Sequence, residues 1–335
     1  MARPEELRLW ARVASLYYEH KLKQTEVATR LGLSQASVSR ALRRAEEEGI
    51  VRIAVSTPAG TFPDLEDAVL DRYGLREVIV VDPGHSDREM LRNLGSAAAF
   101  YVESTLDRNE VIGISSWSET LLAMTRALHP TGRPSSARVL QILGGVGNPV
   151  GETHASQLTR QLAEPLRADI TMLPAPGIVG SGATRDVLLA DPYVAEALRM
   201  FSEVTLALVG IGAMTPSKLL ASSGNVFTAG ELDQLREKGA VGDICLRFFD
   251  ANGVPVTSDV QDRVISIELE QLREVRRSVG IAGGARKLEA IAGAVRGRWI
   301  NVLITDAVTA AALADMDVNS ASAVDEIVAR VGSES

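Results

Sequence analysis

A helix-turn-helix pattern near the start of the chain, residues 21–52, constrains the fold more than any other feature. Apolar residues share one face of a helix expected over about residues 25–31, and Ala28 is small enough to let a second helix cross closely. Gly32 then turns the chain, because glycine takes a positive φ without steric cost. Ser34 is placed to cap a second helix that continues the apolar seam and ends in a basic ladder.

The outward-facing side chains of this unit suit DNA. Polar side chains at the start of a helix can hydrogen-bond base edges in the major groove, while arginines further along hold phosphates. A surface helical hairpin with a solvated charged face is the alternative reading of the same pattern. We predict a DNA-binding set that consists of Thr25, Ser34, Gln35, Ala36, Ser37, Ser39, Arg40, Arg43 and Arg44.

Length and charge indicate two domains of different character. The 335 residues are too many for one small domain, and 46% hydrophobic content is enough for a large core. Residues 1–55 hold 10 basic and 7 acidic side chains, and the remainder holds 25 and 36. A basic head on an acidic body can bind DNA through the head while the body avoids the duplex.

The small number of cysteines and histidines limits the kinds of disulfide and metal site that the chain can form. The single cysteine, Cys245, cannot form an internal disulfide, and no run of about 18 apolar residues is present to span a membrane. Four scattered histidines offer no metal cluster. We therefore expect a cytoplasmic protein that has no metal site and no cofactor.

The boundary between the two domains is expected at residues 56–63, a segment with two prolines, a glycine and small polar residues. This places a DNA-binding domain at 1–55, which ends in a short strand over residues 50–55, and a second domain at 64–335. Asp64 can cap the first helix of the second domain, which is expected to run through Tyr73 and to be closed by Gly74.

Strand-like and helical runs alternate through the second domain. Such alternation predicts an α/β fold with a parallel sheet covered by helices, in which ligands bind in the loops beyond the carboxyl ends of the strands. The strand-like runs are EVIVVD from 77, EVIGIS from 110, RVLQIL from 138, DITMLP from 169, EVTLALVGIG from 203, VGDICLRFFD from 241, RSVGIAGG from 277 and NVLITD from 301.

Four strand-end loops carry candidate binding residues. Residues 113–120, GISSWSET, offer hydroxyls and backbone N–H groups at the start of a helix, where an anion is favoured. Residues 144–154 are glycine-rich and lead to His154. Residues 239–244 contain Asp243, and residues 282–287 end in Lys287 about one turn into a helix. Each loop alone is weak evidence, because turns after strands need glycine anyway.

Together these segments resemble one family, the SorC-type sugar-binding bacterial transcriptional regulators, which are also grouped with DeoR-like repressors. The resemblance extends over nearly the whole chain. It is carried by the head at 21–52, VIGISSWSETL at 111–121, LQILGG at 140–145, LPAP at 173–176, GIG at 210–212, GAVGDICLRFFDANG at 239–253 and the segment 281–313.

The resemblance implies a winged-helix-like DNA-binding head joined to an effector domain similar to sugar-phosphate isomerases and deaminases. The implied function is repression of a carbohydrate or polyol operon through binding to operator DNA. The protein would act as a homo-oligomer, a tetramer built as a dimer of dimers, and would not bind a membrane. The effector is a sugar, polyol or sugar phosphate. Its implied contacts are Ser115, Ser116, Trp117, Ser118, Glu119, Thr120, Gly144, Gly145, His154, Asp243 and Lys287. The chemistry agrees, because polyols suit a carboxylate acceptor and phosphates suit backbone N–H groups with a cation.

Two positions depart from the pattern of the family. The family loop usually has a glycine and then a basic or neutral residue where this chain has Ser118 and Glu119. A glutamate opposes a phosphate, so either its charge points outward or the ligand is unphosphorylated or placed differently. Leu143 stands where some members have a polar or basic ligand contact.

An enzyme is the rival interpretation, since the same architecture in isomerases and deaminases acts on sugar phosphates. Asp243 and Lys287 are present, but no further acid/base pair of recognisable spacing accompanies them. Such an enzyme would carry the head as a DNA-binding or interaction domain. A dinucleotide site is disfavoured, because GGVGNP lacks the complete G-x-G-x-x-G helix opening and the N-terminal domain would be unexplained. Asp243, Lys287 and His154 also have structural interpretations, as a turn brace, a solvated lysine and a helix-surface residue.

Overall fold

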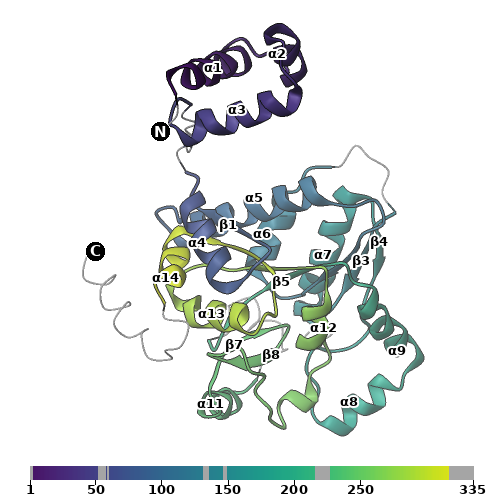
Figure 1. Cartoon of the computed structure of the whole chain (residues 1–335). Coiled ribbons are helices and arrows are strands. Elements are labelled where there is room, and N and C mark those ends of the chain that lie inside the picture. Colours follow the sequence, from purple (N-terminus) through teal and green to yellow (C-terminus); the bar gives the residue numbers. More distant parts are fainter. Residues whose placement is uncertain are drawn as a thin grey trace. The chain divides into compact units, whose positions relative to one another are not determined.

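The computed structural model describes residues 3–51, 58, 60–130, 136–145, 149–215 and 227–316, and excludes the side chains of residues 149–155. The chain divides into two compact units, Met1–Pro58 and Ala59–Ser335, drawn in Figure 1. The division falls inside the segment taken as the linker. Each unit is described by itself below.

The smaller unit is helical. Its helices are α1 (Pro4–Ala14), a π-helical turn η1 (Ser15–Glu19), α2 (Gln24–Leu31) and α3 (Gln35–Glu47). Gly32 ends α2 at φ 64°, and the Ser34 hydroxyl caps α3 by accepting from the backbone N–H of Ser37 at 3.1 Å. Both expectations for the turn between the helices are therefore confirmed.

Apolar side chains of all three helices form the core of this unit. Val13, Leu16, Val27 and Val38 are each at most 1% exposed and belong to one cluster. The strand expected at residues 50–55 is not seen where it can be checked, because Ile50 and Val51 lie in a bend. Residues 52–55 lie outside the described residues.

The larger unit is built on a seven-stranded, entirely parallel sheet in the order β1-β10-β9-β5-β2-β3-β4. This confirms the α/β class. The strands are β1 (Glu77–Val81), β2 (Val111–Ile114), β3 (Arg138–Gln141), β4 (Asp169–Thr171), β5 (Leu206–Gly210), β9 (Arg277–Ile281) and β10 (Val302–Asp306).

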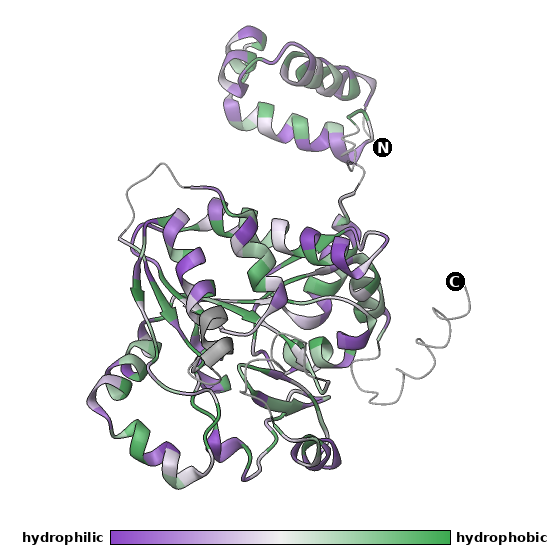
Figure 2. Ribbon diagram, turned by 180° about the vertical axis from the view of Figure 1, so that it is seen from behind, coloured by the Kyte–Doolittle hydropathy of each residue, from purple (hydrophilic) through white to green (hydrophobic). Residues whose placement is uncertain are grey.

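Helices cover both faces of this sheet, as successive residues of β5 illustrate. Leu206 and Leu208 pack in one buried cluster with α5, α6 and α7, while Ala207 and Val209 pack in the other cluster with α4, α13 and α14. Figure 2 shows the apolar strands between helices with polar outer sides. The helix bounds are α4 (Pro63–Tyr73), α5 (Asp87–Thr105), α6 (Glu119–Ala127), α7 (Pro149–Leu166), α8 (Gly182–Leu189), α9 (Pro192–Arg199), α11 (Ala229–Glu237), α12 (Leu269–Glu274), α13 (Leu288–Arg296) and α14 (Ala307–Asp315), with short 3₁₀ turns at Met200–Glu203, Gln261–Arg263 and Ala285–Lys287.

The prediction of one strand of the parallel sheet was wrong. Residues 241–250 instead belong to a second, antiparallel sheet of β6 (Gly212–Ala213), β7 (Ala240–Ile244) and β8 (Arg247–Asp250). The run reads as one strand, but it reverses at Cys245 and Leu246, which have φ of 53° and 65°. Two consecutive positive φ values are the mark of a tight hairpin turn that normally uses glycine or asparagine.

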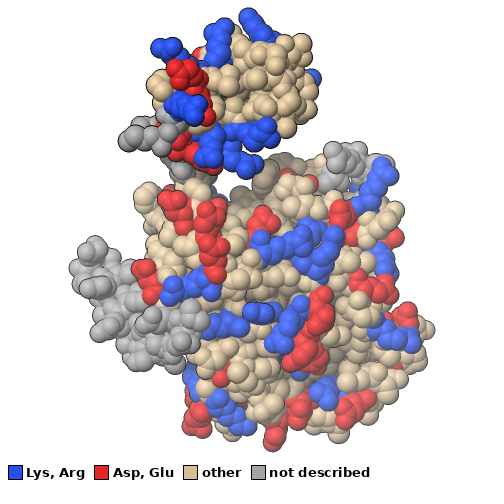
Figure 3. All heavy atoms as spheres, in the orientation of Figure 1, with Lys and Arg blue, Asp and Glu red and all other residues tan. Residues whose placement is uncertain are grey.

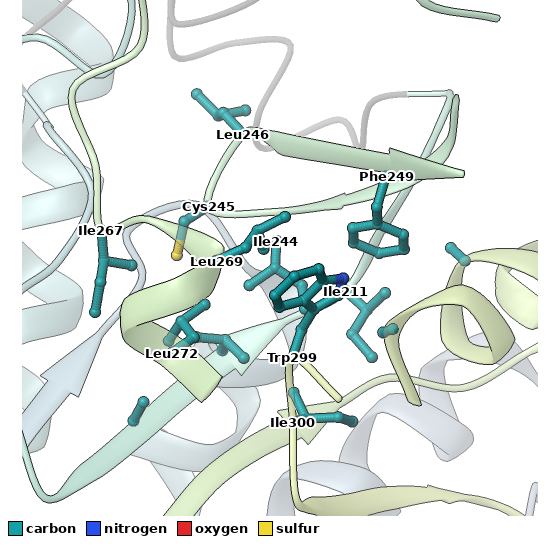
Figure 4. Close-up of a cluster of buried hydrophobic side chains, with 14 of the residues drawn as sticks. Ile211, Ile244, Cys245, Leu246, Phe249, Ile267, Leu269, Leu272, Trp299 and Ile300 are labelled. Atoms are coloured by element: carbon teal, nitrogen blue, oxygen red, sulfur yellow. The ribbon is translucent and has the colours of Figure 1, made fainter. Parts of the chain in front are cut away.

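The hairpin turn is held by burial. Figure 4 shows the Cys245 and Leu246 side chains on opposite sides of it, within a cluster that also contains Ile244, Phe249 and Trp299. Cys245 and Leu246 are 4% and 3% exposed. Packing therefore compensates for a backbone conformation that these residues adopt only at a cost.

The start of the larger unit also differs from expectation. Helix α4 begins at Pro63, with Phe62 in the capping position, so Asp64 lies in the first helical turn and does not cap. Proline is favoured at this first position because its missing N–H is not needed there. The last residue of the expected linker is thus helical. Gly74 ends α4 at φ 63°, as expected.

Candidate DNA-binding helix and effector site

Helix α3 and its capping residue Ser34 present most of the predicted DNA-binding side chains to solvent, and Thr25 lies in α2. Figure 3 shows basic side chains gathered on the side of the smaller unit where α3 runs. Among the predicted residues only Ser37 is half-buried; the exposed ones are Thr25, Ser34, Gln35, Ala36, Ser39, Arg40, Arg43 and Arg44. The buried side of the helix is the seam of Val38, Ala41, Leu42 and Ala45.

The two serines at the start of α3 also have a structural task. The Ser34 and Ser37 hydroxyls lie 2.9 Å apart, and Arg40 donates to the Ser37 hydroxyl at 3.2 Å. Arg44 pairs with Glu47 at 2.8 Å, whereas Arg43 has no polar partner among the residues that the structure describes. Arg43 is therefore the arginine most available for a phosphate.

In the larger unit the loop from β2 to α6, Ser115–Thr120, uses its hydroxyls to brace neighbouring strands. Ser116 donates to the carbonyl of Leu143, just after β3, at 2.7 Å. Thr120 donates to the carbonyl of Ile281, the last residue of β9, at 3.1 Å. These side chains tie three strand ends together.

The backbone N–H groups of the same loop are available to a ligand, because the loop hydroxyls are used within the protein. Ser116 and Trp117 are buried, and their N–H groups donate to no acceptor in the described part of the chain. Backbone N–H groups at the start of a helix that are not used within the described protein can donate to a ligand oxygen. The Ser118 hydroxyl caps α6 by accepting from Leu121 at 3.3 Å. A side chain on Gly210 would meet this hydroxyl, since an added Cβ would lie 2.6 Å from it.

Asp243 lies in β7, where it pairs with Gly212, two residues beyond the end of β5. Asp243 is 9% exposed, and its carboxylate accepts a hydrogen bond from the backbone N–H of Leu246 at 2.9 Å. Burial raises the pKa of Asp243 to about 6, although the Leu246 hydrogen bond and the charge of Lys287 act in the opposite direction. The other carboxylate oxygen lies against Gly212, where an added Cβ would be 2.0 Å away.

Lys287 stands just before α13, at the end of the turn Ala285–Lys287, and not one turn inside a helix. Lys287 is half-buried, and its ammonium makes no hydrogen bond or direct ion pair within the described chain. Burial lowers the pKa of Lys287, while the charges of Asp243 and Glu119 raise it. Glu119, the exposed first residue of α6, is thus close enough to Lys287 to act on it through space.

The loop that carries Lys287 is fixed by a residue to which the sequence analysis assigned no role. Asp306, at the end of β10, accepts from the backbone N–H of Gly284 at 2.7 Å. Gly284 has φ 94° and so occupies a region that side chains rarely adopt. The available signal was a carboxylate as the last residue of a buried, apolar strand.

Most predicted effector residues therefore meet at the carboxyl ends of β2, β3, β5 and β9. Gly144 and Gly145 follow β3, and an added Cβ on Gly144 would lie 2.3 Å from the carbonyl oxygen of Pro176. The Leu143 side chain is buried, and the Leu143 carbonyl accepts the hydrogen bond from the Ser116 hydroxyl. His154 does not open helix α7, which begins five residues earlier at Pro149, and the His154 side chain lies outside the described residues.

A separate cleft of about 470 Å³ is lined by Arg247, Phe248, Gln261, Glu268 and neighbouring residues. It contains none of the predicted effector residues. Arg247 is hydrogen-bonded to Glu268 at 2.6 Å and to Ser266 at 3.2 Å, so it supports the loop before α12.

Within the described ranges no cluster of three or more histidine, cysteine or acidic residues could hold a metal ion. No helix in those ranges has the length and apolarity that a membrane span requires.

A helix-turn-helix unit joined to a parallel-sheet unit with polar groups at its strand ends defines a DNA-binding regulator with an effector domain. Comparison with known protein families agrees. A sugar-binding domain family matches residues 58–314, and a winged helix-turn-helix DNA-binding family matches residues 17–52.

Characterised relatives and a solved structure match over nearly the full length. The chain is 32% identical over 310 residues to the deoxyribonucleoside regulator of Bacillus subtilis, which covers 92% of this chain and 98% of that protein. It is 31% identical over 313 residues to the sorbitol operon regulator of Klebsiella pneumoniae, with the same shares covered. The crystal structure of full-length SorC from Klebsiella pneumoniae matches with a TM-score of 0.70 and 30% identity, over 93% of this chain and 100% of that one.

The chain belongs to the SorC family of sugar-binding transcriptional regulators. It is a regulator and not an enzyme, so the isomerase or deaminase alternative is not supported.

Proposed function

We propose that this regulator represses a carbohydrate or polyol catabolic operon and that a sugar, polyol or sugar phosphate changes its affinity for operator DNA. The observation that carries the proposal is a group of polar atoms at the strand ends. Among the described residues, the buried Asp243 carboxylate accepts a hydrogen bond from Leu246, the Lys287 ammonium has no partner, and the Ser116 and Trp117 N–H groups have no acceptor. A polyhydroxylated ligand supplies both donors and acceptors to such a set.

The proposed effector contacts are those of the sequence analysis. Asp243 accepts from ligand hydroxyls, Lys287 donates to the ligand, and the backbone N–H groups of the Ser115–Thr120 loop bind an oxygen-rich end. The Ser116, Ser118 and Thr120 hydroxyls support the loop instead, because each already has a partner inside the protein. Glu119 disfavours a doubly charged phosphate close to Lys287, since like charges repel most where water is scarce.

The proposed domain limits are 1–55 for DNA binding and 64–335 for effector binding and assembly. A single helix-turn-helix reads few base pairs, so specific binding requires at least two half-sites and hence an oligomer, proposed as a dimer of dimers. Light scattering of the full chain tests this assembly. A monomer that binds its operator with full affinity would contradict it.

Thermal-shift screening of the full chain against matched pairs of free and phosphorylated sugars and polyols tests the effector. A ligand at 100 times its dissociation constant stabilises the folded state by roughly 2.7 kcal/mol. We expect one carbohydrate to raise the melting temperature of the wild type more than that of Asp243→Asn. If every carbohydrate shifts both proteins equally, or none shifts either protein while operator binding is intact, the proposed effector class is wrong.

A further inference from the structure

Asp306 has more hydrogen bonds than the start of a helix requires. The residue is 1% exposed, and its Oδ1 accepts from the backbone N–H groups of Val308 and Thr309 at 3.1 and 3.0 Å, which caps α14. Its Oδ2 accepts from the Gly284 N–H at 2.7 Å and from the Thr309 hydroxyl at 2.6 Å. One oxygen therefore serves the helix, and the other serves the loop that leads to Lys287.

A second capping aspartate in the same domain shows what the cap alone needs. Asp191 caps α9 with a single oxygen, which accepts from Tyr193 and Val194 at 2.9 and 3.2 Å. No further hydrogen bond to its carboxylate is present in the described structure. The two bonds at Oδ2 of Asp306 are therefore additional to capping.

The backbone of the loop is shaped around this carboxylate. An added Cβ on Gly283 would lie 2.4 Å from Asp306 Oδ2, so the loop passes directly over the oxygen. Gly284 follows with φ 94°, and its carbonyl accepts from the Lys287 N–H at 2.9 Å. The backbone of Gly284 is thus hydrogen-bonded to Asp306 through its N–H and to Lys287 through its carbonyl.

We propose that Asp306 is a positioning residue for the effector site, and that its second carboxylate oxygen holds the 283–287 loop so that the Lys287 ammonium is presented to the effector. The inference rests on the proposed function, in which Lys287 contacts the ligand. Asp306 itself acts through the loop, and the Thr309 hydroxyl assists it by accepting from the Gly284 N–H at 3.0 Å.

The first test compares Asp306→Asn with Asp191→Asn in the full chain. Asparagine keeps one oxygen for the helix cap and caps nearly as well as aspartate, but its NH₂ group cannot accept from Gly284. Hydrogen exchange of residues 282–288 is measured without ligand, which makes this readout independent of the effector. We expect exchange about tenfold faster in Asp306→Asn and unchanged in Asp191→Asn. Equal exchange in all three proteins would overturn the proposal.

The second readout is calorimetric affinity for the carbohydrate found in the thermal-shift screen, together with ligand-free operator affinity. We expect Asp306→Asn to bind the carbohydrate about tenfold more weakly, with operator affinity within about twofold of the wild type. Carbohydrate binding that is undiminished in Asp306→Asn would overturn the inference while the proposed function stands. If the wild type binds no carbohydrate, the proposed function fails and the exchange experiment still decides the role of Asp306 in the loop.

A pair of variants at Thr309 keeps the test usable if Asp306→Asn does not fold. Thr309→Val keeps the shape of the side chain and removes the hydroxyl, whereas Thr309→Ser keeps the hydroxyl. We expect faster loop exchange and several-fold weaker carbohydrate binding in Thr309→Val, and values near the wild type in Thr309→Ser. If the serine variant loses as much as the valine variant, packing of the methyl group and not the hydrogen bond fixes the loop, and the proposal fails.

Discussion

The two units of this regulator place their functional groups in opposite ways. In the smaller unit most of the proposed DNA-binding side chains project from one exposed helix face, and the polar partners they have lie within four residues. In the larger unit the proposed effector groups come from strand ends far apart in sequence, and Asp243 is buried. The first site depends on a local helix, and the second depends on the topology of a sheet.

This contrast predicts how each site responds to change. Exposed groups on a helix can be removed one at a time at little cost to folding. Removal of a group that is hydrogen-bonded between loops changes the positions of its neighbours as well. Four predictions test the contrast.

Loss of the Lys287 charge is expected to have the largest effect. Lys287→Met should weaken effector binding by about 2 kcal/mol, or roughly thirtyfold, because a hydrogen bond to a charged donor is lost. Calorimetry gives the effector affinity, and operator binding without effector should stay within about twofold. Arg286→Met removes the neighbouring exposed charge and serves as the control. Equal losses in both variants would mean that net charge alone matters.

The arginines of α3 should divide into two kinds. Arg40→Ala should weaken operator binding by roughly tenfold with little effect on random DNA, because Arg40 lies toward the base-contacting end. Arg43→Ala should weaken all sequences and reduce the salt dependence, and Arg44→Ala should do so less because Arg44 pairs with Glu47. Titrations of both DNAs at several salt concentrations measure this. Identical losses for the three variants on both DNAs would refute the division.

The raised pKa of Asp243, about 6, predicts weaker effector binding in acid. As pH falls from 7 to 5 the carboxylate takes up a proton and stops accepting from ligand hydroxyls, so affinity should fall about tenfold. The same group affects stability in the other direction. Because its pKa is higher folded than unfolded, burying the charged form destabilises the fold above pH 6, and that penalty is relieved as pH falls.

Asp243→Asn should remove both pH effects between pH 5 and 7. Calorimetry across this range measures the affinity, and chemical denaturation measures the stability. A wild-type affinity that does not change with pH would show that the effector does not need the ionised carboxylate.

Glu119 is expected to have the smallest effect. Glu119→Gln should tighten binding of a phosphorylated effector about threefold and leave a free polyol unaffected, because a charge near Lys287 is removed. Asp87→Asn is the matched control, since Asp87 likewise opens a helix after a capping serine. No change in either variant would mean that Glu119 does not sense the ligand.

The sequence predicted the features that depend on nearby residues. The glycine turn at Gly32, the cap at Ser34 and the helices on either side of them follow from residues a few positions apart. The parallel sheet also followed, because its strands are apolar runs separated by helical ones. Gly74 at the end of α4 belongs to the same group.

Features fixed by distant contacts could not be predicted. The hairpin at Cys245 has no glycine or asparagine, so only its burial under the rest of the domain explains the turn. The bond from Asp306 to Gly284 joins the end of one strand to the loop after another, a pairing that no spacing encodes. The hydroxyls of Ser116 and Thr120, predicted as ligand contacts, also donate to strand-end carbonyls that the sequence alone does not place beside them.

The pairing of β1 with β10 has a consequence for how the protein is made. The pairing joins residues 77–81 to residues 302–306, so the edge of the sheet stays incomplete until almost the whole chain has left the ribosome. The smaller unit has its contacts within the first 58 residues and can fold much earlier. During synthesis a folded DNA-binding head therefore exists before the domain that is to control it.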